Sequence, residues 1–340
     1  MPPANTFPEL TLTGDSRKRG LAHGEQLRGE IARTIDFYRQ LFALSEQQLK
    51  EQALFYAGLI GEFSADYASE IESIARGADV QPWLIYALNS RSEILNNCSV
   101  PECTAAINTR KSLLCQNWDW SQALEDLVVL LRIERNDGHR IATLTEPGIL
   151  AKVGLNSCGI GVCLNILQAN TRLRGLPIHL LLRAILDCKD ISSVRGLVDA
   201  NRVGKASHIL VGNAVGDCLS VEFSGPVRHI LCADDGLLWH SNHYLANDDL
   251  NTSEAFPSTR ERYARAGRLL SEDASINGLW QMMSDHSEGE LSICRSYSPS
   301  ATPGFGNVGT IFSVLMELQQ GTLRIRRGDS PDRSDYTIKI

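Results

Sequence analysis

The sequence predicts an α+β protein, in which a helical N-terminal segment precedes a layered α/β/β/α domain with antiparallel sheets. Residues 16–97 carry apolar side chains mainly at helical spacing, whereas from residue 103 onward short apolar runs alternate with turn-forming residues. A succession of hairpins favours antiparallel sheets over strand–helix–strand units. Two helical stretches interrupt the hairpins, which predicts helices packed on the sheets.

The helical segment divides into three regions. The first runs to residue 42, the second covers residues 46–76, and the third lies near residues 82–96. Gly77 is expected to end the second helix, because glycine readily adopts the left-handed conformation of a helix C-terminus. His23, in the first region, is expected to be a packed or surface side chain rather than a ligand.

The strands are expected to form hairpins, because Gly, Asn or Asp stands in each short connection. The expected pairs are 103–108 with 112–118, 127–134 with 140–145, 151–155 with 159–165, 207–212 with 218–223, 228–232 with 237–241, and 311–318 with 322–327. The helical stretches between them are residues 176–201, predicted as two helices broken near Asp190, and residues 258–271 with 274–284.

Length and charge exclude several classes of protein. A chain of 340 residues allows one large domain or two. The net charge of −7 comes from interspersed acidic and basic residues, and no basic block suggests a nucleic-acid or membrane surface. The N-terminus has neither the basic nor the apolar part of a secretory signal, and no run of about 18 apolar residues occurs. We therefore expect a cytoplasmic protein without nucleic-acid or membrane partners.

Nine cysteines occur, and no two of them form a CxxC pair. This spacing argues against a zinc knuckle or a thioredoxin-like site. Most of the cysteines stand in apolar strand-like runs, where buried free thiols in a reducing compartment are the simplest interpretation.

Cys103 differs from the other cysteines in its position. It stands where the helical segment ends and the first hairpin begins, and an Asn-x-Asp-Trp sequence closes that hairpin. This arrangement suggests an N-terminal nucleophile, made when the bond between Glu102 and Cys103 is cut. The freed α-amine then acts as the base for the adjacent thiol. A buried strand cysteine is the structural alternative.

Three polar residues are candidates for the same site. Asp119 lies across the hairpin, where its carboxylate could reach the α-amine of Cys103 and favour the charged form of that amine. Asn242 ends a strand, and its amide could donate to an oxyanion. Arg295 follows an apolar run and could place a fixed charge beside a thiolate or carboxylate. A turn aspartate, a strand-end cap and a surface ion pair are the respective structural alternatives.

The remaining aromatic and basic candidates are less specific. Trp118 and Trp120 are expected to alternate in direction, so that one packs in the core and the other lines an acyl pocket; Trp120 and Thr104 are assigned to substrate binding. His240 and His243 have a spacing that suits a helix better than a strand end, with no third ligand nearby. No metal site is therefore expected.

Several motifs together resemble the isopenicillin N acyltransferase family of N-terminal-nucleophile hydrolases. The motifs, which span nearly the whole chain, are Arg-Gly-x-x-His-Gly-Glu at 19–25, Cys103-Thr104, Gln-Asn-Trp-Asp-Trp at 116–120, residues 154–165, His-Ser-Asn-His at 240–243, and Ser-Ile-Cys-Arg at 292–295. The resemblance implies a four-layer αββα sandwich with two antiparallel sheets. It also implies site roles for Cys103, Asp119, Asn242 and Arg295. Asn165 would be a second site asparagine that holds the substrate amide or lends its backbone N–H to the oxyanion.

The chain departs from the family pattern at two positions. Glu102 stands where the best-known members of the family have glycine before the nucleophile, and glycine eases the backbone strain of self-cleavage. Gln116 stands where the bile-salt branch carries arginine, which favours the acyltransferase branch.

These observations lead to three functional hypotheses. The first is a self-cleaved cysteine amidohydrolase without cofactor that acts on a small N-acyl amide; residues 1–102 would form an α chain and residues 103–340 a β chain, in one intertwined heterodimer. The second is an acyltransferase that moves an acyl group from a thioester or amide donor to an amine. The third is an uncleaved relative that only binds an acyl compound or a protein partner. Glu102 is the residue that favours this hypothesis, because it replaces the glycine before the nucleophile.

Overall fold

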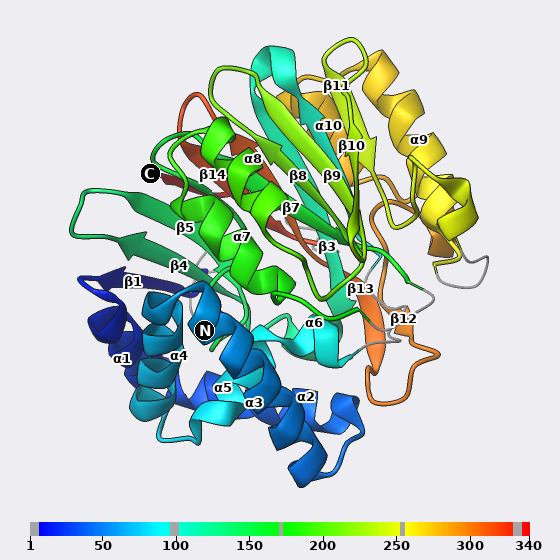
Figure 1. Ribbon diagram of the computed structural model, residues 1–340. Helices are drawn as coiled ribbons and strands as arrows, with labels where there is room; N and C mark the ends of the chain where they lie inside the picture. Colours follow the sequence, from blue (N-terminus) through cyan, green and yellow to red (C-terminus); the bar gives the residue numbers. More distant parts are fainter. Residues whose placement is uncertain (1–6, 96–101, 170–172, 252–255, 329–334) are drawn as a thin grey trace.

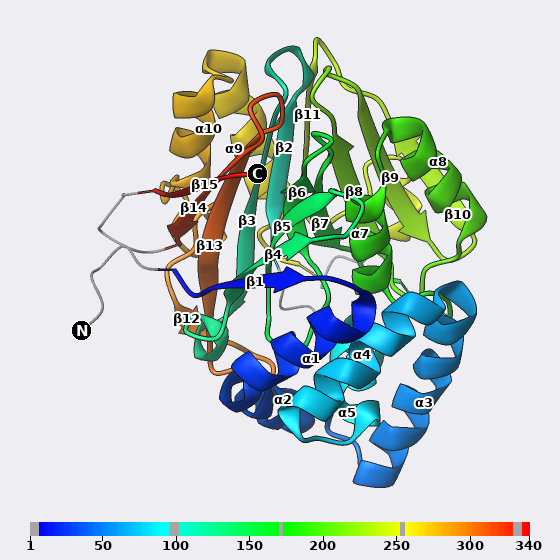
Figure 2. The ribbon, with the colours of Figure 1, turned by 90° about the vertical axis from the view of Figure 1, so that its left-hand side faces the viewer.

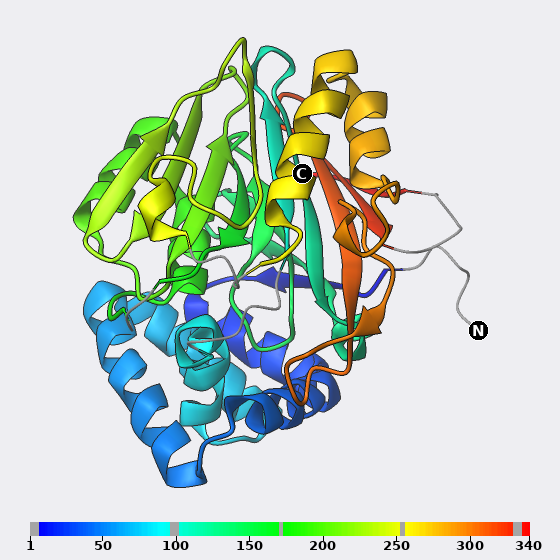
Figure 3. The same cartoon turned by 90° about the vertical axis from the view of Figure 1, so that its right-hand side faces the viewer.

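The computed structural model describes residues 7–95, 102–169, 173–251, 256–328 and 335–340, and it has the predicted two-part arrangement (Figure 1). A group of helices lies at one end of the molecule, beneath the sheets (Figure 3). These helices are α1 (Ser16–Gln26), α2 (Arg28–Phe42), α3 (Glu46–Phe63), α4 (Ala65–Ala78), α5 (Pro82–Asn89) and α6 (Arg91–Ile94), and the short strand β1 (Glu9–Thr13) precedes them.

The second predicted helical region is two helices. Ser64 separates α3 from α4, and its hydroxyl accepts a hydrogen bond from the Tyr67 backbone N–H as the N-cap of α4. The prediction that Gly77 ends this region is wrong, because α4 continues to Ala78 and Asp79 takes the left-handed conformation, with φ of 59°.

Gly77 serves close helix packing instead. A Cβ at Gly77 would lie 2.4 Å from the Leu21 carbonyl oxygen, and one at Gly24 would lie 2.2 Å from the Ile74 carbonyl oxygen. Helices α1 and α4 therefore cross where neither carries a side chain. This crossing gives a physical reason for the glycines of the Arg-Gly-x-x-His-Gly-Glu motif.

The described strands form two sheets. The first sheet has the order β1-β4-β5-β6-β7-β8-β9-β10, with β4 (Val129–Glu134), β5 (Arg140–Thr145), β6 (Val153–Asn156), β7 (Gly161–Ile166), β8 (Ser207–Gly212), β9 (Cys218–Ser224) and β10 (Val227–Leu231). Its pairs are antiparallel except that β1 joins β4 in parallel. The edge strand β1 thus ties the N-terminal segment into the sandwich.

The second sheet has the order β11-β2-β3-β13-β14-β15, and β12 pairs with β13. Its strands are β11 (Leu237–His240), β2 (Thr104–Asn108), β3 (Leu113–Ser121), β13 (Asn307–Glu317), β14 (Thr322–Arg327), β15 (Tyr336–Lys339) and β12 (Ser298–Pro299). All its pairs are antiparallel.

One predicted hairpin is wrong. β10 pairs with β9 in the first sheet, whereas β11 pairs with β2 in the second. The connection is still a tight turn, since Asp234 and Leu237 form an isolated bridge and Asp235 and Gly236 have positive φ. Turn residues signal a reversal of the chain, but they do not reveal whether the next strand stays in the same sheet.

Helices cover both outer faces and complete the four layers (Figure 2). The pair α7 (Ile178–Asp187) and α8 (Ile191–Ala200) lies on the first sheet, and α9 (Thr259–Glu272) and α10 (Ile276–Met283) lie on the second. The predicted break near Asp190 is confirmed, because the Asp190 carboxylate caps α8 by accepting from the Ser193 N–H. Within the described residues, no helix has the length and apolar content that a membrane crossing requires.

Candidate active site

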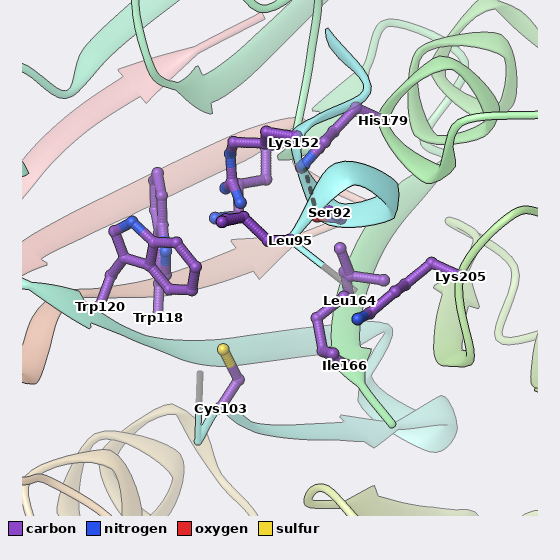
Figure 4. Close-up of a pocket in the computed structure, with 11 residues that line it drawn as sticks. Ser92, Leu95, Cys103, Trp118, Trp120, Lys152, Leu164, Ile166, His179 and Lys205 are labelled. Carbon is purple, nitrogen blue, oxygen red and sulfur yellow. Dashed lines mark hydrogen bonds between the residues drawn. The ribbon is translucent and has the colours of Figure 1, made fainter. Parts of the chain in front are cut away.

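Cys103 directly precedes β2, the strand between β11 and β3. In the β2–β3 hairpin Thr104 pairs with Asn117, so Cys103 lies beside the next residues of β3, Trp118 and Asp119. The predicted hairpin is thus present, although β3 runs on to Ser121. Cys103 is 4% exposed, and its sulfur points into a narrow pocket (Figure 4).

The pocket is small, with a cavity volume of about 20 Å³. One part of its lining is apolar or aromatic and consists of Leu95, Cys103, Trp118, Trp120, Leu164 and Ile166. The other part is polar or basic and consists of Arg91, Ser92, Lys152, His179 and Lys205. Such a lining suits an apolar group that carries a polar or anionic substituent.

Both tryptophans line this pocket, so the expectation that they point in opposite directions is wrong. Residues two apart on a strand share a face, because side chains alternate with a period of two. Trp120 donates from Nε1 to the Tyr38 hydroxyl at 3.1 Å. Lys152 Nζ lies 3.3 Å from the centroid of the Trp118 ring, and burial lowers the pKa of Lys152 well below its usual value.

The Cys103 thiol is held mainly in its neutral form. Burial raises its pKa, and the nearby Asp119 carboxylate raises it further, while Lys152 and Arg262 act in the opposite direction. The Cys103 carbonyl oxygen accepts from Asn165 Nδ2 and from Arg262 Nη1, both at 2.9 Å. The backbone of the candidate nucleophile is therefore fixed from two sides.

Asp119 is fully buried, and one of its oxygens is unused. Oδ1 accepts from the Thr310 hydroxyl at 2.6 Å, whereas Oδ2 has no hydrogen-bond partner among the described residues. Burial raises the pKa of Asp119 to about 7, against the opposing influence of Arg295 and Arg262. A cation placed at Oδ2 would be strongly stabilised.

Asn165 joins the site through a buried chain of hydrogen bonds. Its Oδ1 is 3.1 Å from His208 Nδ1, and His208 Nε2 is 2.8 Å from the Ser220 hydroxyl oxygen. Because burial lowers the pKa of His208 well below its usual value, the ring is neutral. Since Asn165 Oδ1 can only accept, His208 Nδ1 carries the proton. This bond directs the Asn165 amide N–H groups toward Cys103.

Asn242 is linked to Cys103 through Arg262. Asn242 Nδ2 donates to the Ile166 carbonyl at 2.9 Å, and its Oδ1 accepts from Arg262 Nη2 at 2.8 Å. The Thr104 hydroxyl also accepts from Arg262, at 2.9 Å, and Thr104 is not among the residues that line the pocket. Thr104 therefore contacts the inner framework of the site rather than its open space.

Arg295 forms an ion pair with Glu102, the residue before Cys103. Arg295 Nη1 donates to Glu102 Oε1 at 2.7 Å, and the Ser258 backbone N–H donates to Oε2 at 3.3 Å. The Ser258 hydroxyl also donates to Oε2, and Arg262 Nη2 lies 3.6 Å from it. The charge of Arg295 thus lies beside a carboxylate, which was one of the two neighbours that the sequence suggested. The Arg295 side chain is 13% exposed.

Two functional candidates escaped the sequence reasoning. Arg262 is fully buried on α9, in a helix whose sequence is rich in arginine and gives no sign of which one faces inward. Lys152 is 5% exposed and stands just before β6. A lysine inside the apolar stretch Ile149–Leu155 was a detectable signal, since lysine is almost never fully buried without a partner.

The two histidines considered as metal ligands are engaged elsewhere. His240 Nε2 contacts Glu222 Oε1 at 2.8 Å, and His243 Nδ1 contacts the Thr259 hydroxyl at 2.9 Å. Gln116, the position that separates the family branches, donates to the Leu164 carbonyl and accepts from the Leu164 N–H, both at 2.9 Å. Its amide therefore ties the second sheet to the first below the pocket.

The fold matches that of N-terminal-nucleophile hydrolases. The structure superposes on a mutant of conjugated bile acid hydrolase from Clostridium perfringens with a TM-score of 0.52 and 10% identity, covering 70% of this chain and 92% of that one. A second variant of the same enzyme gives a TM-score of 0.51 with the same coverage and identity. At this identity the likeness shows a common fold, which confirms the predicted sandwich.

Sequence comparison gives a closer relationship. Residues 107–332 match the family model described as acyl-coenzyme A:6-aminopenicillanic acid acyl-transferase. Over 347 aligned residues the chain is 30% identical to the acyl-coenzyme A:6-aminopenicillanic-acid-acyltransferase 40 kDa form of Emericella nidulans, covering 96% of this chain and 94% of the relative. The chain is therefore an enzyme that acts on amide bonds, and it belongs to the acyl-coenzyme A:6-aminopenicillanic acid acyl-transferase family.

Proposed function

We propose that this protein is a self-cleaved cysteine amidohydrolase that hydrolyses a small N-acyl amide through an acyl-enzyme on Cys103. The observation that carries the proposal is the pairing of two buried groups at the start of β2. The thiol of Cys103 faces a pocket, and the neighbouring Asp119 carboxylate has one oxygen without a partner among the described residues. An α-ammonium on Cys103 could donate a hydrogen bond to that oxygen.

Self-cleavage begins when Cys103 Sγ attacks the carbonyl carbon of Glu102. A C–S bond forms and the C–N bond of the peptide breaks; the thiol proton goes to the released amine. Water then hydrolyses the thioester and leaves a carboxylate on Glu102 and a free thiol on Cys103. The new α-amine has a reference pKa of about 7.7 to 8.0, so it can exchange protons with the thiol at neutral pH.

Turnover repeats this attack on an external amide. The α-amine of Cys103, oriented by Asp119, accepts the thiol proton and later gives it to the leaving amine. The Asn242 amide would stabilise the oxyanion, whereas Asn165 Nδ2 holds the Cys103 and His240 carbonyls at 2.9 and 3.5 Å. Asn242 Nδ2 has two N–H donors, and the bond to the Ile166 carbonyl uses one of them. Water releases the acyl group.

Contacts across residue 102 support an α piece that stays bound after the cut. Glu70 pairs with Arg183 at 3.1 Å, and the Tyr38 hydroxyl donates to Glu146 at 2.5 Å. Strand β1 is also a member of the first sheet. Cys103, Cys115 and Cys163 are free thiols, which supports the proposed cytoplasmic location.

An acyltransferase reaction at the same site is the second candidate, and family membership favours it. In that reaction an amine rather than water takes the acyl group from Cys103. Dependence of the rate on added amine, together with preference for thioester over amide donors, would identify a transferase. Hydrolysis in buffer without any acceptor amine would identify a hydrolase.

N-terminal sequencing and denaturing mass spectrometry test the cleavage. We expect two pieces from the wild-type chain, the larger beginning Cys-Thr-Ala-Ala. Cys103→Ala should remain one chain of 37.5 kDa without amidase activity. Cys163→Ala is the matched control, because Cys163 is also a buried strand cysteine but contacts the Cys115 carbonyl; it should still be cut. An active wild-type protein whose Glu102–Cys103 bond stays intact would exclude the mechanism, whereas an intact and inactive protein would support the binding-protein hypothesis.

A further inference from the structure

The Glu102 carboxylate occupies a site built to hold a carboxylate. Both of its oxygens have donors: Oε1 has Arg295 Nη1 at 2.7 Å, and Oε2 has the Ser258 N–H at 3.3 Å. The Ser258 hydroxyl and the Arg262 guanidinium complete the set. The side chains of Glu102, Arg262 and Arg295 are 8%, 0% and 13% exposed. We call Ser258, Arg262 and Arg295 the carboxylate cradle.

The backbone of helix α9 contributes to the cradle as well. Ser258 is the N-cap of α9, a helix of 14 residues, and its N–H points at the carboxylate rather than into the helix. The partial positive charge of a helix N-terminus adds to the charge of the two arginines. Arg262 also donates to the Cys103 carbonyl, so the cradle lies directly against the candidate nucleophile.

The occupant of the cradle has a special relation to the chemistry. Glu102 supplies the carbonyl carbon that Cys103 attacks in the proposed self-cleavage. In that first reaction the acyl group is therefore a glutamyl unit, with its side-chain carboxylate fixed in the cradle. The acyl carbon and the carboxylate carbon of such a unit are separated by three carbons.

We propose that the cradle is the acyl-recognition site of the mature enzyme, selective for five-carbon acyl groups with a terminal carboxylate, such as glutaryl or α-glutamyl amides. This inference rests on the proposed hydrolase function. Glu102 acts as a built-in substrate before the cut, and an external acyl group takes its place afterwards. Cys103 Sγ bonds to the acyl carbon as the amine leaves with a proton, and water then releases the dicarboxylate.

A competing source of charge selectivity lies in the pocket. Lys152 lines the pocket together with Arg91 and Lys205, outside the cradle. Arg91 is paired with Glu146 at 3.0 Å, whereas Lys152 faces the Trp118 ring. Substitution of Lys152 therefore distinguishes selectivity set by the pocket from selectivity set by the cradle.

The first experiment compares hydrolysis of glutaryl and valeryl 4-nitroanilides by the cleaved wild-type enzyme. These acyl groups have the same chain length, and only the terminal carboxylate differs. We expect kcat/KM to favour the glutaryl substrate by roughly 10⁴-fold, because the valeryl analogue would leave the buried donors of the cradle unpaired. The ratio of the two kcat/KM values should approach one in Arg295→Gln and also in Ser258→Ala, which is a smaller change to the cradle. It should stay at the wild-type value in Lys152→Gln.

The outcomes separate the two proposals. Equal hydrolysis of both anilides by cleaved protein would overturn the cradle inference and leave the hydrolase function intact. A preference that disappears in Lys152→Gln but persists in Arg295→Gln would also overturn it. Hydrolysis of neither anilide by cleaved protein would also overturn the cradle inference, whereas the hydrolase proposal is decided by the cleavage test and by Cys103→Ala.

A second experiment measures the cradle without any turnover. In Cys103→Ala the chain stays uncut and Glu102 fills the cradle, whereas the double variant Glu102→Gly, Cys103→Ala leaves it open. Sodium propionate, which matches the removed side chain of Glu102, should raise the Tm of the double variant only, when compared with sodium chloride at equal ionic strength, because a ligand that binds the folded state stabilises it. A propionate effect that is absent from both proteins, or equal in both, would refute the proposed carboxylate site.

Discussion

Replacement of Glu70 by Gln should destabilise the protein strongly, because Glu70 joins two buried arginines across the proposed cut. Its Oε2 contacts Arg19 at 2.6 Å and its Oε1 contacts Arg183 at 3.1 Å. The side chains of Glu70 and Arg183 are 2% and 1% exposed. Burial alone would raise the pKa of Glu70, but Arg183 and Arg19 hold it below its usual value, so the carboxylate is charged.

The magnitude follows from what Gln leaves behind. Removal of one partner from a buried ion pair typically costs about 3–5 kcal/mol, because the remaining charge stays buried without compensation. Here Arg183 keeps Asp187 at 3.1 Å, and Arg19 keeps the Gly14 carbonyl at 2.6 Å. We therefore expect a loss near the lower end, about 3 kcal/mol.

Urea denaturation measures this loss most clearly in the Cys103→Ala background, where the chain stays in one piece. The control is Arg39→Gln, which breaks the exposed pair between Arg39 and Glu46, whose side chains are 44% and 68% exposed. Exposed pairs contribute about 0–1 kcal/mol. If Glu70→Gln cost no more than Arg39→Gln, the buried network would not be what holds the two pieces together.

Three further predictions concern buried titratable groups. His23 Nε2 accepts from the Gly148 N–H at 2.9 Å, and burial lowers the pKa of His23 to about 4. Acidification from pH 6.5 to 4 should therefore lower the free energy of unfolding by about 3 kcal/mol. Denaturation of His23→Gln as a function of pH should show a smaller decrease. Burial raises the pKa of Asp119 to about 7, so in uncut protein the unfolding free energy should fall by about 3 kcal/mol between pH 4 and 7, and Asp119→Asn should abolish this fall. Because His208 orients Asn165, His208→Ala should lower kcat about tenfold or more with little change in KM. His208→Gln should recover part of the lost rate. An unchanged kcat in His208→Ala would exclude this positioning role.

The sequence was sufficient where a local rule decides the structure. Asp190 breaks residues 176–201 into two helices, because an aspartate at that point caps the second helix. The hairpin after Cys103 formed as expected, because its apolar runs and its turn set the register. Strand pairing then brought Asp119 next to Cys103 with no further information.

The sequence was insufficient where a distant element decides. Gly77 looked like a helix end, but the approach of α1 requires a glycine inside α4. The turn before β11 looked like a hairpin, but it carries the chain from one sheet to the other. Arg262 became visible only when α9 was placed over the start of β2, 159 residues away in sequence from Cys103.

The charges around Cys103 are consistent with the cleavage that we propose. Burial raises the pKa values of both the Cys103 thiol and the Asp119 carboxylate; the Asp119 charge raises that of the thiol further, and Glu102 raises that of Asp119. Arg262, a cation that acts on both groups, and Arg295, which acts on Asp119, already lie against the Glu102 carboxylate. Cleavage would add an ammonium group on Cys103, beside the unused oxygen of Asp119, and a nearby cation lowers the pKa of a thiol and of a carboxylate alike. The event that frees the base would thus also make the thiolate accessible near neutral pH, so cleavage and catalytic competence depend on the same new charge.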